Sequence, residues 1–232
     1  NLLLTALANI SGNMSDGIES LGKVLNLKGK VLPLTEDNVI LMGQMEDDSI
    51  VEGEHNITLD KHKIKKVFYK EEPVVNPNAI KAIKEADLII LSMGSLFTSI
   101  IPNLICKDMK KAIDESHAKV MYVCNMTTQP GETDDFKVSD HVRLLNEYLG
   151  DKKIDIVIAN KGKIAQDIVD KYATLEQKDP VILDKENMPK NIQIISSDFV
   201  SLESGVIRHN VIKLSISKLI FLIQKYYQLM KC

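Results

Sequence analysis

The sequence predicts an α/β fold in which a mainly parallel sheet is covered by helices. Three near-continuous apolar runs, at residues 87–93, 120–123 and 154–158, are typical of strands that are buried on both faces. Helical patterns at residues 107–117 and 139–149 separate these runs. Because strands and helices alternate along the chain, right-handed crossovers and therefore parallel strand neighbours are favoured.

The composition is that of a globular protein. The chain has 232 residues, of which 44% are hydrophobic and 26% are charged. These fractions exclude a disordered or fibrous protein. The formal net charge is −3, so the chain lacks the basic balance of proteins that grip duplex nucleic acid, and we expect no nucleic-acid partner. The longest candidate apolar segment, Leu219–Ile223, is far shorter than the ~20 residues of a membrane span.

The cysteines indicate the redox environment. Cys106, Cys124 and Cys232 stand singly and far apart, with no Cys-x-x-Cys pair among them. An odd number of isolated cysteines suits neither a disulfide framework nor a zinc site. We therefore expect a reduced, cytoplasmic protein.

The chain begins within a helical pattern, at residues 2–10, and not with methionine. This start lacks the basic segment and the cleavage site of a signal peptide. We expect residues 1–232 to form a single α/β domain that is truncated at its N-terminus. A second helix is expected to be capped by Ser15 or Asp16 and to end at Gly29, since glycine adopts the left-handed conformation at low cost.

Residues 30–70 are expected to form a β-rich insertion, built as a β-hairpin excursion. Short β-rich runs at residues 31–32, 39–42, 50–51 and 67–69 are separated by clusters of turn residues. The insertion carries one acidic and one basic segment, which we interpret as solvated faces. A scaffold that binds protein partners through this hairpin is the alternative interpretation.

The starts of two further helices are indicated by the residue types found there. Pro77 suits the first turn of a helix, and Ser139 is expected to cap the helix that follows it. Near the end of the chain, strands are expected close to residues 181–183 and 192–195. A long helix is expected over residues 211–230.

Three loops carry the candidate functional site, because ligands of open parallel sheets bind beyond the carboxyl ends of the strands. The first loop contains Gly94, Ser95, Thr98 and Ser99. Its glycine permits close approach of an anion, its hydroxyls are donors, and a following helix would direct N–H groups at a phosphate. The loop lacks the Gly-Lys-Ser/Thr signature of a Walker A motif, and a capped strand-to-helix turn is the alternative.

The second loop spans residues 125–133. Asn125 and Gln129 offer amide donors and acceptors that suit a base or sugar hydroxyls. Glu132 and Asp134 are candidates for an acid, a base or a Mg²⁺ ligand. The alternative is a polar surface loop whose side chains satisfy its own backbone.

The third loop and two later residues give weaker signals. Residues 160–163 place two lysines beside a glycine, which suits a diphosphate or a solvated lysine pair. Tyr172 suits stacking on a base, and Arg208 suits a phosphate clamp. The alternatives are an amphipathic surface tyrosine and an arginine in a salt bridge or a cap.

Familiar catalytic motifs are absent from the sequence. It contains neither a Gly-x-Ser-x-Gly elbow nor a His-Glu-x-x-His pair, and its five histidines lack metal-ligand spacing. Asp140 and His141 are adjacent on a helix, about 100° apart around its axis, which argues against a dyad. Cys124 follows a buried strand and is expected to be a small core residue. No catalytic residue is therefore assigned beyond the candidates Glu132 and Asp134, and no metal site is assigned.

Three motifs occur in order along the chain: Asn1–Leu7, Ala86–Leu104, and Val123–Thr133 followed by Ser139–Val142. Together they resemble the gluconeogenesis-factor proteins of the YvcK type, which belong to the superfamily of CofD, the phospholactate transferase of deazaflavin coenzyme biosynthesis. The resemblance runs through essentially the whole chain. The family's Gly-rich first turn and its Asp-Asp-Gly-Gly stretch do not occur here, so the resemblance implies that an N-terminal part is absent.

The resemblance implies a Rossmann-like, three-layer α/β sandwich. For the YvcK-like branch it implies a regulatory protein that binds a UDP-sugar such as UDP-N-acetylglucosamine and is needed for cell shape and growth on gluconeogenic carbon. The CofD branch implies the alternative, a Mg²⁺-dependent transferase that acts on a nucleotide-activated phospho-substrate. Association into a homo-oligomer is left open. The residues that match ligand-binding positions are Gly94, Ser95, Thr98, Ser99, Asn125, Thr128, Gln129, Tyr172 and Arg208.

Overall fold

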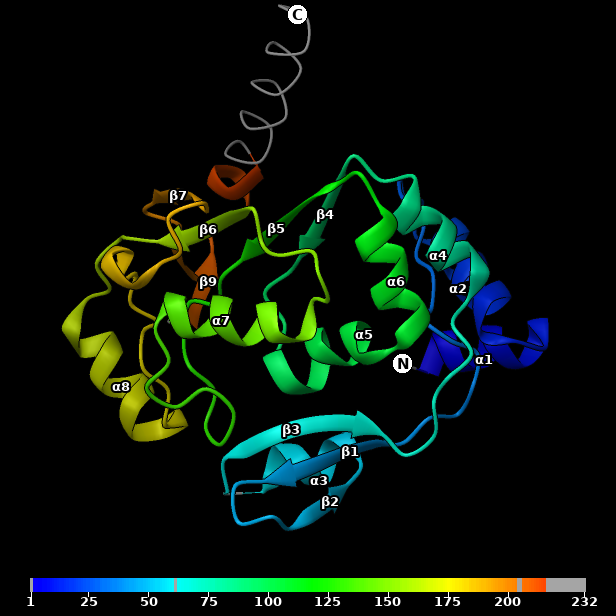
Figure 1. Cartoon of the computed structure of the whole chain (residues 1–232), viewed down its shortest axis with the longest axis horizontal. Helices are drawn as coiled ribbons and strands as arrows, with labels where there is room; N and C mark the ends of the chain where they lie inside the picture. Colours follow the sequence, from blue (N-terminus) through cyan, green and yellow to red (C-terminus); the bar gives the residue numbers. More distant parts are fainter. Residues whose placement is uncertain (1, 61, 204–205, 216–232) are drawn as a thin grey trace, which may run out of the picture. The chain divides into compact units, whose positions relative to one another are not determined.

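The computed structural model describes residues 2–60, 62–203 and 206–215 (Figure 1). The chain divides into two compact units. Unit 1 consists of the described residues up to 89 together with residues 97–118 and 148–152. Unit 2 consists of residues 90–96, 119–147 and the described residues from 153 onward.

Unit 1 combines helices with a small antiparallel sheet. Its elements are α1 (Leu2–Ser11), α2 (Met14–Val24), β1 (Leu41–Met45), β2 (Ile50–Glu52), α3 (Glu54–Leu59), β3 (Ile64–Tyr69), α4 (Pro77–Lys84), α5 (Ile101–Ile105) and α6 (Lys107–Glu115). The sheet has the order β2-β1-β3, and both pairings are antiparallel. The predicted β-hairpin excursion is therefore confirmed.

Helix α3 was not predicted, and Gly43 explains how it fits beside the sheet. A Cβ atom at Gly43 of β1 would lie 3.1 Å from Cγ1 of Ile57, the buried residue of α3. The absence of a side chain therefore lets the helix approach the strand closely. Residues 31–32, by contrast, form no strand, so that prediction is wrong.

The ends of α2 differ from the prediction. Its N-cap is Asn13, whose side-chain oxygen accepts a hydrogen bond from the Asp16 N–H at 2.8 Å. Asparagine is among the best N-cap residues, and it precedes the predicted caps in the chain. The helix ends at Val24, before Gly29, because Asn26 already adopts the left-handed conformation with a φ of 50°. Pro77 does lie in the first turn of α4, as predicted.

The larger sheet has the order β4-β5-β6-β7, and its β5–β6 and β6–β7 pairings are parallel. The strands are β4 (Leu88–Leu91), β5 (Lys119–Val123), β6 (Ile156–Asn160) and β7 (Gln193–Ser197). The division between the units passes through β4. The prediction of an α/β fold with a mainly parallel sheet is confirmed.

The two central strands form the core of unit 2. In β5, every residue from Val120 to Val123 is 0% exposed, and in β6 the first four residues are at most 1% exposed. This double-sided burial explains their continuous apolar sequence. In β4, Ile90 is 40% exposed, so the prediction that this strand is buried on both faces is wrong.

Unit 2 contains further elements besides the strands of this sheet. They are α7 (Val138–Tyr148, of which Tyr148 belongs to unit 1), α8 (Gln166–Glu176), the 3₁₀ turn η2 (Lys185–Asn187) and the antiparallel pair β8 (Val200–Glu203) and β9 (Val206–His209). Helix α7 begins at Val138, so Ser139 lies inside its first turn and is not the predicted cap.

Of the two strands predicted near the end of the chain, one is present. The strand predicted near residues 181–183 is absent, since only an isolated bridge pairs Thr127 with Pro180. The strand predicted near residues 192–195 is present as β7. Of the long helix predicted over residues 211–230, residues 216–230 lie outside the described part of the chain.

Candidate functional site

The loops that follow β4 and β5 lie side by side in unit 2. The amide Nδ2 of Asn125 donates a hydrogen bond to the carbonyl oxygen of Gly94 at 3.0 Å. The hydroxyl of Ser95 donates a hydrogen bond to the carboxylate of Glu132, which is only 7% exposed. The structure thus brings the first part of the first predicted loop into contact with the second, at the carboxyl edge of the sheet.

A buried hydrogen-bond network of Tyr122 and His141 holds the side chain of Asn125 in place. The Tyr122 hydroxyl donates to Oδ1 of Asn125 at 3.3 Å and lies 2.9 Å from Nδ1 of His141. Because the hydroxyl gives its one proton to Asn125, the proton between Tyr122 and His141 belongs to Nδ1 of the histidine. Burial raises the pKa of Tyr122 well above its usual value, so the hydroxyl stays protonated. The network therefore fixes the Asn125 amide with its oxygen toward Tyr122 and its nitrogen toward Gly94.

A cavity of about 220 Å³ opens beside this network, and we call it the amide cavity. Its most informative group is the Oε1 atom of Gln129, which is buried without a hydrogen-bond partner in the described part of the chain. A buried acceptor without a hydrogen-bond partner lowers the stability of the fold. A ligand that donates a hydrogen bond to this oxygen would remove that cost and therefore bind more tightly. The residues that line the cavity are Met93, Ser95, Asn125, Met126, Thr127, Gln129, Lys178, Ile207 and His209.

Two of the predicted site residues support the frame of the amide cavity without lining it. Thr128 is buried, and its hydroxyl accepts a hydrogen bond from the Asp179 N–H at 2.9 Å. Tyr172 of α8 is buried as well, and its hydroxyl accepts from the Ile207 N–H at 2.7 Å. The first bond holds Asp179 and thereby its neighbour Lys178, and the second holds Ile207. Lys178 and Ile207 both line the cavity.

Three other predicted residues lie elsewhere. Arg208 is exposed on β9, and strand alternation places it on the face opposite to Ile207 and His209. Thr98 and Ser99 lie on the π-helical turn η1 (Leu96–Ile100) and belong to unit 1. Thr98 is half-buried and Ser99 is exposed.

The candidate acid–base residues are engaged by groups of their own loop or its neighbour. Glu132 accepts from Ser95, and Oδ2 of Asp134 accepts from the Gly131 N–H at 2.8 Å. In the described part of the chain, no group of three or more histidine, cysteine, aspartate or glutamate side chains could hold a metal ion. Cys124 is buried, and burial raises the pKa of its thiol to about 12, so it is a core residue as predicted.

Six of the nine residues that line the amide cavity were not predicted as site residues: Met93, Met126, Thr127, Lys178, Ile207 and His209. Ile207 and His209 come from β9, and the signal for a hairpin was present, because two β-rich four-residue runs flank a Ser-Gly pair. Lys178 is presented by a turn in which Gln177 has a φ of 53°. No residue pattern marks that left-handed turn, since glutamine seldom adopts it.

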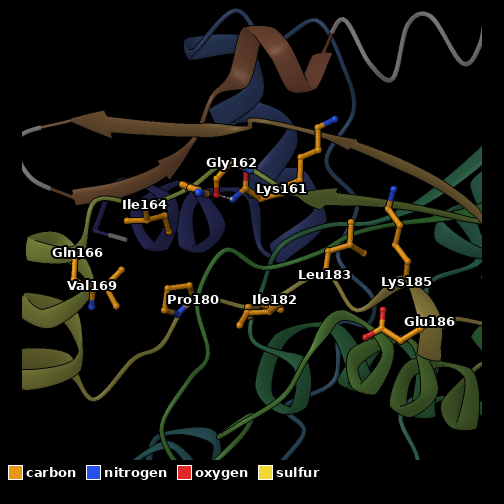
Figure 2. A pocket seen from close by; sticks show the side chains of 13 residues that line it. Lys161, Gly162, Ile164, Gln166, Val169, Pro180, Ile182, Leu183, Lys185 and Glu186 are labelled. Carbon is orange, nitrogen blue, oxygen red and sulfur yellow. Dashed lines mark hydrogen bonds between the residues drawn. The ribbon is translucent and has the colours of Figure 1, made fainter.

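A second and larger cavity of unit 2, of about 650 Å³, surrounds the third predicted loop (Figure 2). We call it the lysine cavity. The side chain of Asn160 holds the loop in place, because its Oδ1 accepts from the N–H groups of Gly162 and Phe199, each at 3.0 Å. The residues that line the cavity are Asn160, Lys161, Gly162, Lys163, Ile164, Gln166, Val169, Pro180, Val181, Ile182, Leu183, Lys185 and Glu186.

Comparison with known families gives a match along most of the chain. Residues 1–200 match the family described as 2-phospho-L-lactate transferase CofD. Among the described residues, no helix combines the length and the apolar character that a membrane crossing requires.

Curated relatives carry a consistent name. A protein of Bacillus subtilis named gluconeogenesis factor is 39% identical over 217 residues, which are 93% of this chain and 68% of that protein. A protein of Clostridium acetobutylicum named putative gluconeogenesis factor is 39% identical over 90% of this chain. The present chain spans only about half of that relative, since the match covers 48% of its length.

Solved structures show the same fold. A crystal structure of a protein from Bacillus halodurans matches with a TM-score of 0.88 and 38% sequence identity. The match covers 95% of this chain and 71% of the other. This likeness agrees with the predicted Rossmann-like, three-layer α/β architecture.

Proposed function

Because the chain belongs to the 2-phospho-L-lactate transferase CofD family, we propose that it contributes to a cytoplasmic regulatory protein that binds a UDP-sugar. The ligand reports the supply of a sugar nucleotide such as UDP-N-acetylglucosamine, and the protein is needed for cell shape during growth on gluconeogenic carbon. The similarity to proteins named gluconeogenesis factor supports the regulatory role.

The observation that carries the proposal is the chemistry of the amide cavity. Ser95, Asn125 and Gln129 offer a hydroxyl and two amides, which suit the polar edge of a uracil or the amide and hydroxyls of a sugar. At about 220 Å³ the cavity is smaller than the ~300–1,000 Å³ of a typical small-molecule site. It therefore takes one portion of the nucleotide sugar, and the rest of the ligand extends beyond its rim.

Gln129→Met tests this assignment cleanly, because the glutamine Oε1 has no partner to lose in the described part of the chain. We expect calorimetric titration with UDP-N-acetylglucosamine to show about tenfold weaker binding by the variant, since one buried hydrogen bond to the ligand is removed. The stability of the ligand-free variant should not fall. Gln193→Met, at the exposed first residue of β7, is the matched control and should bind like the wild type. Equal affinity of Gln129→Met and wild type would remove Gln129 from the site.

Arg208 tests how far the ligand extends. We expect the diphosphate to extend from the rim of the amide cavity to the opposite face of β9, so Arg208→Ala should weaken binding roughly tenfold or more through loss of a charge-assisted bond. Arg143→Ala, which removes an exposed arginine paired with Asp140, is the control. Unchanged affinity in Arg208→Ala would confine the ligand to the other face of β9.

The alternative function is a transferase that acts on a nucleotide-activated phospho-substrate. It is favoured by the hydrogen bond between Glu132 and Ser95, because Ser95 lines the amide cavity. Glu132 and Asp134 would supply carboxylate oxygens to Mg²⁺, the cation that such chemistry uses. With Mg²⁺ present, this function predicts release of UMP, UDP or GMP from a nucleotide donor, and loss of that release in Glu132→Gln. No product from any of these donors would count against the transferase and leave the binding function in place.

A further inference from the structure

The lysine cavity is separate from the amide cavity, although both belong to unit 2. The two share no lining residue. Between them, two chain segments pair through their backbones. The Val181 N–H donates to the Met126 carbonyl at 2.9 Å, and the Thr128 N–H donates to the Asp179 carbonyl at 2.8 Å. A small ligand in one cavity would therefore not contact the side chains that line the other.

The charge of the lysine cavity is positive. Three lysines line it, at positions 161, 163 and 185, against the single carboxylate of Glu186. None of the three is ion-paired with another described residue. Figure 2 shows the side chains of Lys161 and Lys185 extending in the same direction, away from Pro180 and Ile182. Two unpaired ammonium groups at one end of a cavity favour an anion there.

Away from these ammonium groups the lining is mostly apolar, although Gln166 lies beside Val169 there (Figure 2). The apolar lining residues are Ile164, Val169, Pro180 and Ile182, and Ile182 is 64% exposed (Figure 2). Exposed apolar surface beside unpaired lysines suits a ligand with an apolar and an anionic end, because each end then meets its complement. The volume of about 650 Å³ lies within the ~300–1,000 Å³ range of small-molecule sites.

The loop of residues 160–163, which carries two of the lysines, is fixed by hydrogen bonds and by tight packing. The Asn160 amide accepts from the Gly162 N–H at 3.0 Å and donates to the Gly162 carbonyl at 2.9 Å. A Cβ atom on Gly162 would lie only 2.1 Å from Oδ1 of Asp198, so a larger residue at position 162 would force the Asp198 side chain or the loop to move. Asp198 lies 3.4 Å from Lys213. The backbone that carries Lys161 and Lys163 is therefore held in place.

We propose that the lysine cavity is a second binding site, specific for a small phosphorylated metabolite that carries an apolar ring or chain. The phosphate lies at Lys161 and Lys185, and the apolar portion lies against Ile164, Pro180 and Ile182. This site is independent of the nucleotide sugar proposed for the amide cavity.

The test is a calorimetric titration of the whole chain with 1-naphthyl phosphate as the probe. We expect saturable binding at one site, and binding at least about tenfold weaker for 1-naphthol and for inorganic phosphate, each of which has only one of the two ends. The double variant Lys161→Gln/Lys185→Gln should weaken binding of 1-naphthyl phosphate about tenfold. The control Lys171→Gln/Lys190→Gln removes the same charge from exposed lysines outside the cavity and should change the affinity less than about twofold.

Three outcomes would overturn the proposal. One is equal affinity of the lysine double variant and the wild type. Another is binding of 1-naphthol as tight as that of 1-naphthyl phosphate, which would show an apolar pocket only. The third is displacement of the probe by UDP-N-acetylglucosamine, which would make the cavity part of the nucleotide-sugar site. If the probe binds as expected and UDP-N-acetylglucosamine does not bind at all, the proposed function fails and this second site stands.

Discussion

The free energy of unfolding should fall by about 3 kcal/mol as the pH drops from 7 to 4, because His141 is buried in its uncharged form. Its side chain is 0% exposed, and its Nε2 atom has no hydrogen-bond partner in the described part of the chain. Burial lowers the pKa of His141 from 6.5 to about 4, although Asp140 acts in the opposite direction. The other groups that face the ring are Tyr122, with centroids 6.1 Å apart, and Phe136, and neither carries a charge.

The direction of the effect follows from proton uptake. Between pH 6.5 and about 4 the unfolded chain binds a proton at residue 141 that the folded chain does not bind. Stability is therefore complete above pH 6.5 and falls as the pH decreases through this window. At 1.36 kcal/mol per pH unit, the full interval corresponds to about 3 kcal/mol.

Urea unfolding of the wild type and of His141→Phe at pH 7, 6, 5 and 4 measures the effect. The variant should lose the part of the pH slope that lies between 6.5 and 4, whatever its stability at pH 7. His117→Gln, which removes an exposed histidine, should keep the wild-type slope. Carboxylates that titrate below pH 5 contribute equally to all three proteins and cancel in the comparison. An unchanged slope in His141→Phe would show that the ring is charged inside the fold.

The positions of the two central strands are the part of the fold that the sequence predicts best, because burial on both faces requires an apolar run. β5 and β6 had to be apolar at successive positions, and this pattern located both strands to within about two residues. The contact between the loops after β4 and β5 follows from the parallel order of their strands, so Ser95, Asn125 and Gln129 could be placed together in advance.

Side-chain partners across long stretches of sequence were not predictable. The sequence showed His141 on a helix, but its bond to Tyr122 depends on how α7 packs on β5. The helix cap of α7 is another case. Ser139 has the right residue type for a cap, yet its hydroxyl is used by Asp184, a residue 45 positions further along the chain. Local pattern cannot distinguish these uses, since serine serves both.

Asp184→Ala should lower the free energy of unfolding by about 2 to 3 kcal/mol, the second largest effect that we expect. Asp184 is 4% exposed, and its carboxylate accepts from the Ser139 N–H at 3.1 Å, the Ser139 hydroxyl at 2.6 Å and Nδ2 of Asn187 at 3.0 Å. The alanine variant leaves these donors unpaired, and it removes a negative charge from the N-terminal turn of α7. Asp179→Ala, which removes an exposed carboxylate of the same segment, is the matched control and should be near neutral in urea unfolding at pH 7.

The pH dependence separates Asp184 from His141. Burial alone would raise the pKa of Asp184, but the hydrogen bonds from Ser139 and Asn187 outweigh it, and the pKa is lowered from 3.8. Its stabilisation is therefore complete above pH 3.8 and is lost as the pH falls below that value, whereas the loss from His141 is complete near pH 4. Asp184→Asn keeps the shape and loses the charge, so its deficit relative to the wild type should shrink below pH 3.8. A deficit that stays constant down to pH 2 would mean that packing at residue 184, and not its charge, holds the start of α7.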